Sequence, residues 1–452
     1  MLDDTNMNVN SQRTSVVYVV NSSLAVGFLE GQPQYLQDRG FDVTVISPER
    51  HKDEWEVARP QGVSMIELPL EREISPLRDL ASLWRLWRII RELRPVITNV
   101  GTPKAGFLGG FASWLNRVPC RFYTLRGLRF ETTTGLRRRL LIYAERLACR
   151  FAHRVICVSK SVQEKAIASG LTSRARTVVF GSGSSNGVDA SRFMLTSEVM
   201  KRADVLRYEL GIPPKAPVVG FVGRLTRDKG IPELTEAFLR LSYQFPDLRL
   251  LLVGRFENGD PLAPETRRCL ESHPRVILPG YCKASPNAEQ RVQRPVEDTP
   301  PFYALMDLLI LPSHREGLPN VVLEAQAAGK PVAAAMATGI VDAVTDGETG
   351  LLFPVGDVSA IVNALTRLLN DKELADKLGC AGQARVTREF RQEQIWEALF
   401  QEYLRVLETT YLPFPRQCIG GGNAADLRAR SGEQPRRPRK LRLLTRTPSS
   451  WR

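Results

Sequence analysis

The chain has 452 residues, of which 43% are hydrophobic and 25% are charged, and its formal net charge is +13. This length and composition are typical of a soluble globular protein with two domains. No stretch reaches the 18 or more apolar residues of a membrane-spanning helix, and the N-terminal sequence lacks the pattern of a secretory signal. We therefore expect neither a transmembrane segment nor export.

Seven cysteines and four histidines are scattered along the chain without the spacing of metal ligands. An odd number of dispersed cysteines is typical of a reduced compartment. We therefore expect a cytoplasmic protein with no metal site and no cofactor.

In chain order, residues 1–14 are predicted to be a flexible N-terminus and residues 15–195 a first α/β domain. Apolar runs predict its strands at 15–20, 42–46, 64–68, 96–100, 120–124 and 154–158. Helical stretches lie between them, at 76–93, 102–115, 136–151 and 160–168. This alternation of strand and helix indicates a parallel sheet covered by helices.

Two of these helices carry arginines close to aromatic residues. Residues 77–94 contain Trp84 and Trp87, together with Arg78, Arg85, Arg88, Arg91 and Arg94. Residues 136–154 contain Arg137, Arg138, Arg139, Arg146, Arg150 and His153. Such basic faces suit the surface of an anionic membrane. A helix packed on the core with its arginines in water explains them equally well.

Residues 196–390 form the predicted second α/β domain, with strands at 218–222, 249–253, 276–278, 308–311, 332–335 and 350–353. The polar stretch 282–295 is predicted to be an inserted loop. Residues 411–452 hold ten Lys or Arg against two acids, which predicts a basic disordered tail. We favour a solvated appendage over a segment that binds nucleic acid or lipid. A ligand is expected between the two domains, at the carboxyl ends of their strands.

The loop after strand 218–222 carries two cations. Gly223 follows the strand and allows a close backbone approach, while Arg224 and Lys229 stand five positions apart before the next helix. Fixed cations in a dry cleft stabilise the concentrated negative charge of a diphosphate. The segment is therefore a candidate diphosphate site.

Two carboxylates eight positions apart follow strand 308–311, with Glu316 in the loop and Glu324 on the second turn of the next predicted helix. Pro319 is predicted to be the first residue of a helix over 319–328, which Gly329 ends. Both acids then border a helix N-terminus, whose free N–H groups favour an anionic or strongly polar ligand. Carboxylates for hydroxyl groups, next to donors for phosphate oxygens, suit a sugar nucleotide.

This spacing resembles the E-x7-E motif of retaining glycosyltransferases of family 4, whose fold is called GT-B. The resemblance covers residues 15–410 and implies two Rossmann-like α/β/α domains with a donor and acceptor cleft between them. It also implies that a C-terminal helix, at 391–410, crosses back to the first domain. By the same resemblance, Glu316 contacts the donor sugar, Glu324 the ribose, and Arg224 and Lys229 the diphosphate. Donor contacts are further implied for Gly223, Gly317, Leu318, Asn320 and Gly339.

The first domain matches this family less closely. Gly27 stands where the family has a glycine pair, and Lys104 lies in a Pro-Lys-Ala-Gly segment of bacterial polysaccharide-assembly members. Arg126 replaces a histidine that many relatives place near the donor sugar. A permanent cation cannot act as a general base, so Arg126 is expected to stabilise charge. The loop 282–295, absent from relatives, leaves the choice of nucleotide base open.

The resemblance implies a hexosyltransferase or N-acetylhexosaminyltransferase that uses a UDP- or GDP-sugar without a metal ion. Its expected acceptor is a saccharide, with preference for a lipid-linked one at the cytoplasmic face of the membrane. Two alternatives remain open at this point: a GT-B protein that binds sugar nucleotides without transferring sugar, and a protein that binds nucleic acid or anionic surfaces through its tail. Arg224 and Lys229 together with the E-x7-E motif favour the enzyme.

Overall fold

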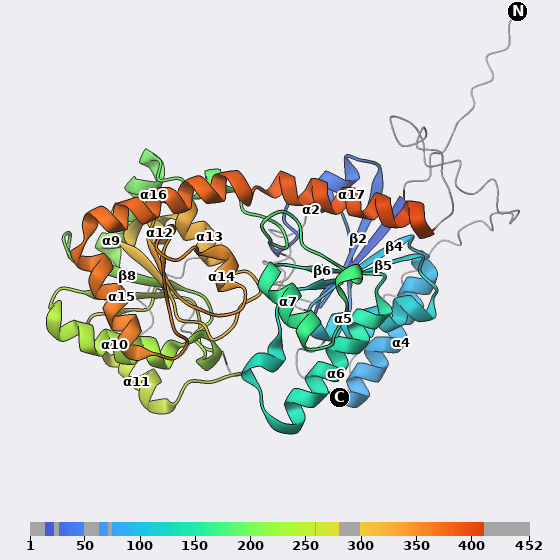
Figure 1. Cartoon of the computed structure of the whole chain (residues 1–452), viewed down its shortest axis with the longest axis horizontal. Coiled ribbons are helices and arrows are strands. Elements are labelled where there is room, and N and C mark those ends of the chain that lie inside the picture. Colours follow the sequence, from blue (N-terminus) through green and yellow to red (C-terminus); the bar gives the residue numbers. More distant parts are fainter. Residues whose placement is uncertain are drawn as a thin grey trace, which may run out of the picture.

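The computed structural model describes residues 14–21, 27–48, 63–70, 75–257, 259–279 and 299–410. Most of the predicted N-terminal segment, the predicted loop 282–295 and the predicted tail 411–452 lie outside these residues. The described chain forms two α/β units, each with its own parallel sheet (Figure 1). The predicted two-domain GT-B architecture is therefore confirmed.

The first sheet has the strand order β3-β2-β1-β4-β5-β6-β7, and all its neighbouring strands are parallel. Its strands are β1 (Thr14–Val19), β2 (Phe41–Ser47), β3 (Ser64–Glu67), β4 (Ile97–Gly101), β5 (Cys120–Leu125), β6 (Arg154–Cys157) and β7 (Thr177–Val178). The helices around it are α2 (Gln32–Gln37), α4 (Pro76–Leu93), α5 (Pro103–Leu115), α6 (Gly135–Phe151) and α7 (Lys160–Ala168). The sequence predicted six of these strands and missed the two-residue β7.

The second sheet has the order β10-β9-β8-β11-β12-β13 and is also parallel. Its strands are β8 (Val218–Val222), β9 (Arg249–Val253), β10 (Val276–Ile277), β11 (Leu308–Leu311), β12 (Val332–Ala335) and β13 (Leu351–Phe353). Its helices are α8 (Ala190–Phe193), α9 (Ser197–Glu209), α10 (Ile231–Gln244), α11 (Pro264–Ser272), α12 (Pro300–Leu305), α13 (Asn320–Ala327), α14 (Ile340–Ala343), α15 (Val358–Asn370) and α16 (Lys372–Glu389).

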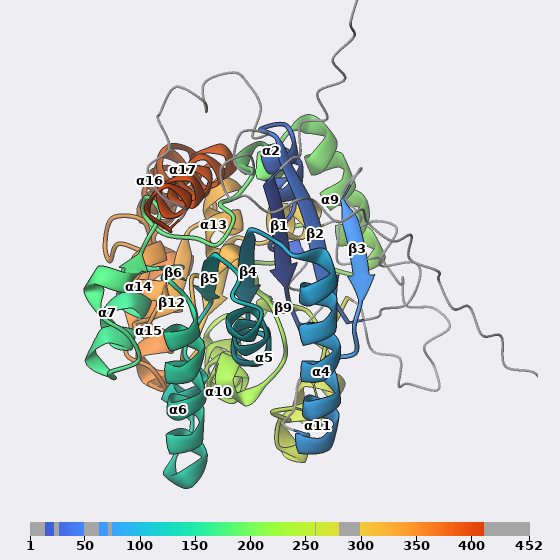
Figure 2. The same ribbon diagram turned by 90° about the vertical axis from the view of Figure 1, so that its right-hand side faces the viewer.

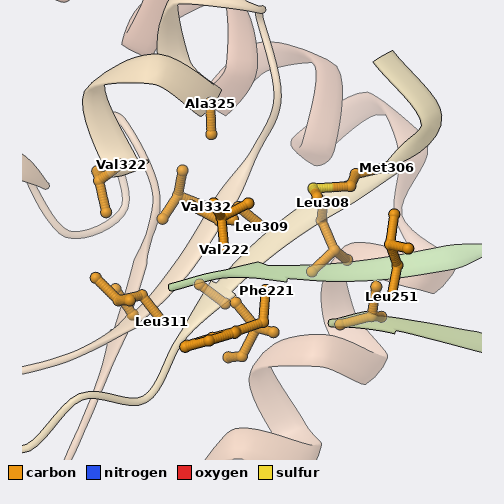
Figure 3. Packing of buried hydrophobic residues seen from close by; sticks show 14 of the residues in the cluster. Phe221, Val222, Leu251, Met306, Leu308, Leu309, Leu311, Val322, Ala325 and Val332 are labelled. Carbon is orange, nitrogen blue, oxygen red and sulfur yellow. The ribbon is translucent and has the colours of Figure 1, made fainter. Parts of the chain in front are cut away.

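The core of the second unit fixes the position of β8 against β11. Figure 3 shows Phe221 of β8 and Leu309 of β11 among buried aliphatic side chains. A Cβ atom on Gly220 would lie 2.1 Å from the sulfur of Met306, so a larger residue at this strand position would require the Met306 side chain to move. Because the two strands are parallel neighbours, the loops that follow them leave from the same edge of the sheet.

Helix α17 (Gln392–Thr410) follows α16 and leaves the second unit to pack on the first (Figure 1). Its residues Ile395, Leu399 and Tyr403 belong to the core on one face of the first sheet. The hydroxyl of Tyr403 accepts a hydrogen bond from Asn99 Nδ2 at 2.7 Å. The predicted crossing of the C-terminal helix is therefore confirmed.

Candidate active site

The two predicted donor segments come together where β8 and β11 end. Arg224 follows β8, Lys229 closes the short 3-10 helix Arg227–Lys229, and Glu316 lies in the loop after β11. The Nζ of Lys229 forms an ion pair and hydrogen bond with Oε1 of Glu316. The structure thus brings together a cation and a carboxylate that the sequence places 87 positions apart.

Arg224 is held by two acids. Its Nη1 donates to Glu257 Oε2 at 3.0 Å, and its Nη2 lies 3.7 Å from Asp228 Oδ2. Burial by itself would lower the pKa of Arg224, but the carboxylates of Asp228 and Glu257 outweigh burial and raise it. Arg315 also pairs with Asp228, at 2.9 Å. The site therefore holds several cations whose charge is met by carboxylates when no ligand is bound.

The loop that carries Glu316 packs tightly on its neighbours. The N–H of Glu316 donates to the carbonyl of Thr338 at 3.0 Å. A Cβ atom on Gly317 would lie 2.2 Å from the carbonyl oxygen of Arg126, and one on Gly339 would lie 2.2 Å from that of Gly317. Gly339 also has a φ of +81°, which favours glycine. These close approaches explain both glycines without a ligand.

Helix α13 begins one residue later than predicted. Pro319, predicted as the first helical residue, has φ −77° and ψ 104° and is the N-cap, so Asn320 is the first helical residue. The helix has eight residues, not the ten predicted. The extended backbone of Pro319 explains the difference, because a residue with this ψ lies outside the helical region. Leu318, the other predicted donor contact here, packs against the core of the second unit.

Glu324 lies on the second turn of α13 and is partly buried. The hydroxyl of Tyr303, on α12, donates to Glu324 Oε2 at 2.6 Å. Burial raises the pKa of Glu324, and the hydrogen bond from Tyr303 partly offsets that rise. The carboxylate is therefore fixed in orientation before any ligand arrives.

Gly223 lies against the next loop of the sheet, while its close approach to a diphosphate stays a prediction. Its φ is +147°, and a Cβ atom on Gly254 would lie 1.8 Å from the carbonyl oxygen of Gly223. The loops after β8 and β9 are thus in contact, and this contact brings Glu257 to Arg224.

The three candidates in the first domain differ in their surroundings. Gly27 is exposed, and a Cβ atom added to it would have no neighbour within 4 Å. Lys104, on the first turn of α5, pairs with Asp79 of α4 at 2.5 Å. Arg126 follows β5, and its Nε and Nη1 atoms are buried without a hydrogen-bond partner.

The first domain contacts the loops of the second through α7. Ser161 Oγ donates to the carboxylate of Asp342 and accepts from the N–H of Gly339 at 2.7 Å. Ser159 Oγ donates to the carbonyl of Gly317 at 2.8 Å. In this arrangement, therefore, the N–H that the sequence assigned to the donor is occupied by Ser161.

The contributors that were not predicted from the sequence include Glu257, Tyr303, Ser161 and Asp342. Glu257 could have been suggested by its position in the loop after a buried strand, because the other site residues lie in loops that also follow strands. Nothing in the local spacing pointed to the other three. Among the described residues, no cluster of three or more His, Cys, Asp or Glu could hold a metal ion.

Comparisons with known proteins agree with this geometry. Residues 203–385 match the model of glycosyl transferases group 1, and residues 30–183 match that of the glycosyl transferase 4-like domain. The chain is 32% identical over 388 residues to the capsular polysaccharide biosynthesis glycosyltransferase CapM of Staphylococcus aureus, covering 86% of this chain and 96% of that protein. It is 27% identical to an Escherichia coli UDP-Gal:alpha-D-GlcNAc-diphosphoundecaprenol alpha-1,3-galactosyltransferase, covering 67% of this chain and 74% of that one.

Solved structures share the fold. Anabaena Alr3699/HepE in complex with UDP-glucose has a TM-score of 0.69 at 22% identity, covering 86% of this chain and 99% of that one. Sucrose-phosphate synthase from Thermosynechococcus elongatus has a TM-score of 0.68 at 20% identity, covering 88% and 100%. With two matching family models and a relative that aligns along nearly its whole length, the chain belongs to the family 4 glycosyltransferases of the GT-B fold.

Proposed function

We propose that this enzyme transfers a hexose or N-acetylhexosamine from a UDP- or GDP-sugar to a hydroxyl group of a saccharide acceptor, with retention of the anomeric configuration. The observation that carries the proposal is the contact between Lys229 and Glu316 at the shared edge of β8 and β11. A cation for the diphosphate and a carboxylate for the sugar hydroxyls are then adjacent. This arrangement suits a nucleotide-sugar, because its sugar and its diphosphate are directly bonded.

The roles follow from the chemistry of each group. Arg224 and Lys229 bind the diphosphate through charge-assisted hydrogen bonds. Glu316 accepts hydrogen bonds from sugar hydroxyls, and Glu324 accepts them from the ribose. Backbone groups of Gly317, Leu318 and Asn320, with Gly223 and Gly339, complete the donor contacts.

The reaction breaks the bond between the anomeric carbon and the phosphate oxygen. As the nucleoside diphosphate leaves, negative charge grows on the phosphate and positive charge on the sugar ring. Fixed cations in a site of low dielectric stabilise the negative charge on the phosphate, and they need not reorganise during the reaction to do so. The acceptor hydroxyl attacks from the face that the diphosphate leaves, which retains configuration, and its proton passes to the departing phosphate oxygen. The proposal assigns the stabilisation of charge to these side chains and to no metal ion.

The acceptor that we propose is a lipid-linked saccharide used to build a cell-surface polysaccharide. The names of two relatives support this choice, since one refers to capsular polysaccharide and the other to a diphosphoundecaprenol acceptor. We propose that the enzyme works at the cytoplasmic face of the membrane as a peripheral protein. Among the described helices, none is long and apolar enough to span a bilayer.

Exposed apolar side chains on α4 support membrane contact. Leu77, Leu80 and Trp84 are 85%, 66% and 56% exposed and follow one another at helical spacing. Trp87, predicted for the same face, is partly buried against the core instead. Both α4 and α6 extend beyond the strands of the first sheet (Figure 2).

Helix α6 adds a second apolar stripe. Leu136, Leu140 and Tyr143 are 82%, 51% and 57% exposed and lie beside the exposed arginines at 137–139. His153, which the sequence grouped with these cations, lies after the helix and contacts Arg121 instead, and burial lowers its pKa to about 4. The membrane surface that we propose is thus formed by α4 and α6 without His153.

A panel of nucleoside diphosphates and their sugars tests the proposal. We expect UDP or GDP to raise the melting temperature of the protein, and the matching nucleotide-sugar to be consumed when a lipid-linked saccharide is added. A protein that binds the nucleotide-sugar but never consumes it would instead be a binding protein with the same fold. Failure of every nucleoside diphosphate to bind would overturn the proposal.

A further inference from the structure

Arg126 stands apart from the other site cations because none of the described residues is its counter-ion. Its Nε and Nη1 are buried and lack a hydrogen-bond partner, although other parts of the residue retain exposed surface. Arg224 and Lys229, by contrast, each contact a carboxylate. A buried cation without a partner is strongly destabilising, so such groups are normally paired. The unpaired donors of Arg126 therefore need a functional explanation.

The groups that surround Arg126 do not supply a negative charge. The pKa of Arg126 is lowered by burial to about 10, and the groups that oppose this effect are the phenols of Tyr18, Tyr123 and Tyr403. Burial raises the pKa of all three phenols, that of Tyr403 to about 12. At neutral pH the guanidinium is therefore charged and the phenols are not. Glu145, a buried acid of the same domain, is hydrogen-bonded to Tyr123 instead.

The place of Arg126 in the fold is the edge of the first sheet that faces the donor loop. Its carbonyl oxygen lies against Gly317, the residue after Glu316. Its Nη1 packs on Gly101 at the end of β4, where a Cβ atom would lie 1.8 Å away. The hydroxyl of Thr102, the next residue, is also buried without a partner. Unused donors thus gather where β4 and β5 end.

A small cavity borders the guanidinium on the side of α17. Its polar lining is Gln32, Asn99, Thr124 and Ser185, and no carboxylate lines it. Asn99 Oδ1 already accepts from Thr124 Oγ1 at 2.8 Å. Within the described part of the chain, the cavity therefore offers Arg126 no anion, and a bound molecule with a negative charge would supply one.

We propose that Arg126 binds a phosphoryl group of a substrate, through the donors that the protein leaves unpaired. The proposal rests on the proposed sugar transfer and adds a third cation, from the first domain, to the two that serve the donor diphosphate. A guanidinium is suited to this role because its planar fork matches two phosphate oxygens. The phosphoryl group belongs either to the donor or to a phosphate-linked acceptor. Binding of UDP reports on the first source, and binding of pyrophosphate to the UDP-saturated protein reports on the second.

The experiment compares the wild type with Arg126→Gln, Arg126→Lys and Arg174→Gln. The last removes the same charge from an exposed position in the short 3-10 helix Arg174–Arg176 of the same domain and serves as the matched control. UDP is titrated calorimetrically into each protein, and inorganic pyrophosphate is then titrated into each protein saturated with UDP. Melting temperatures without ligand are measured in parallel.

If the group belongs to the donor, Arg126→Gln binds UDP about 10- to 150-fold more weakly than the wild type. If it belongs to the acceptor, UDP affinity is unchanged, and the wild type binds pyrophosphate as a second ligand while Arg126→Gln does not. In both cases Arg126→Lys retains part of the binding and the control retains all of it. The melting temperature of ligand-free Arg126→Gln is at least that of the wild type, because an unpaired buried charge has been removed.

The inference is overturned if Arg126→Gln and the wild type bind both probes equally well. It is also overturned if Arg126→Gln is less stable than the wild type and Arg126→Lys binds both probes normally, because Arg126 would then act only in packing. If the wild type binds GDP and not UDP, the same titrations are made with GDP. If it binds no nucleoside diphosphate, the proposed function fails, and pyrophosphate titration of the unsaturated proteins still decides the role of Arg126.

Discussion

Lys229 and Glu316, which the proposal assigns to opposite ends of the bond that breaks, form an ion pair with each other. Their side chains are only 15% and 14% exposed. A donor must therefore separate the pair, so that Lys229 exchanges a carboxylate for phosphate and Glu316 exchanges an ammonium for sugar hydroxyls. The ion pair keeps both charges compensated in a partly buried site until the donor replaces each partner.

The cations of this site should contribute to turnover in proportion to their contact with the diphosphate. Replacing Arg224 or Lys229 with Ala removes a charge-assisted contact of about 1.5–3 kcal/mol. This is a loss of roughly 10- to 150-fold in kcat/KM. Arg227→Ala is the matched control, since Arg227 lies in the same turn but is 65% exposed and pairs with Asp260. Equal activity of all three variants would remove the diphosphate assignment.

Activity should not depend on an added metal ion if these side chains carry the charge. We expect transfer by enzyme treated with EDTA to equal that of untreated enzyme. The measurement is the initial rate with and without Mg²⁺ or Mn²⁺ after chelation. A large loss on chelation that is restored by one of these ions would show that a metal shares the role given to Arg224 and Lys229.

The stability of the first domain should depend on pH through Glu145. Burial raises the pKa of this acid from 4.5 to about 7, and Tyr123 donates to it at 2.7 Å. Because the folded state holds the proton more tightly, stability should fall as pH rises from 4.5 to 7 and then level off. The shift corresponds to about 3 kcal/mol at most. Glu145→Gln should make this decline smaller. The free energy of unfolding is measured with urea at about pH 5 and about pH 8, which lie on either side of most of the transition. A difference between the two pH values that is the same in the variant and the wild type would contradict the role of Glu145.

The apolar stripe on α4 should contribute to membrane binding. A chain that ends at Thr410 should bind anionic vesicles at low salt and dissociate as the salt concentration rises, since each basic residue near such a surface contributes about 1 kcal/mol. Replacing Leu77, Leu80 and Trp84 together with Ser should weaken this binding in a sedimentation assay.

The control for this variant lies in the second domain. Tyr208 and Tyr243 are 88% and 89% exposed, so replacing both with Ser removes comparable exposed apolar surface away from α4. We expect the control to sediment as the unmodified chain does. Equal binding by all variants would show that the α4 stripe is not the membrane contact, and no binding at low salt would favour a soluble acceptor.

The strands could be predicted because each is an apolar run ended by a turn, as in 308–311. The site loops could be predicted because the carboxyl ends of parallel strands share one edge. The motif residues Glu316 and Glu324 were recognised from their spacing and their resemblance to a family. Contacts such as Tyr303 with Glu324 could not be predicted, since they depend on how α12 packs against α13.

The start of α13 shows a second limit. Proline is favourable both as a first helical residue and just before a helix, so the sequence could not decide between these positions for Pro319. Arg126 shows a third limit. The sequence predicted its position after β5. It could not predict that the groups facing the guanidinium are three tyrosines from β1, β5 and α17, which carry no negative charge at neutral pH.

The two carboxylates of the motif provide the most direct test of the central claim. Calorimetry with the nucleoside diphosphate alone should show weaker binding to Glu324→Gln, because the ribose loses a charged acceptor. Glu316→Gln should bind the same nucleoside diphosphate nearly as well as the wild type and yet lose sugar transfer. An equal loss of nucleoside diphosphate affinity in both variants would contradict the division of the site into a nucleotide end and a sugar end.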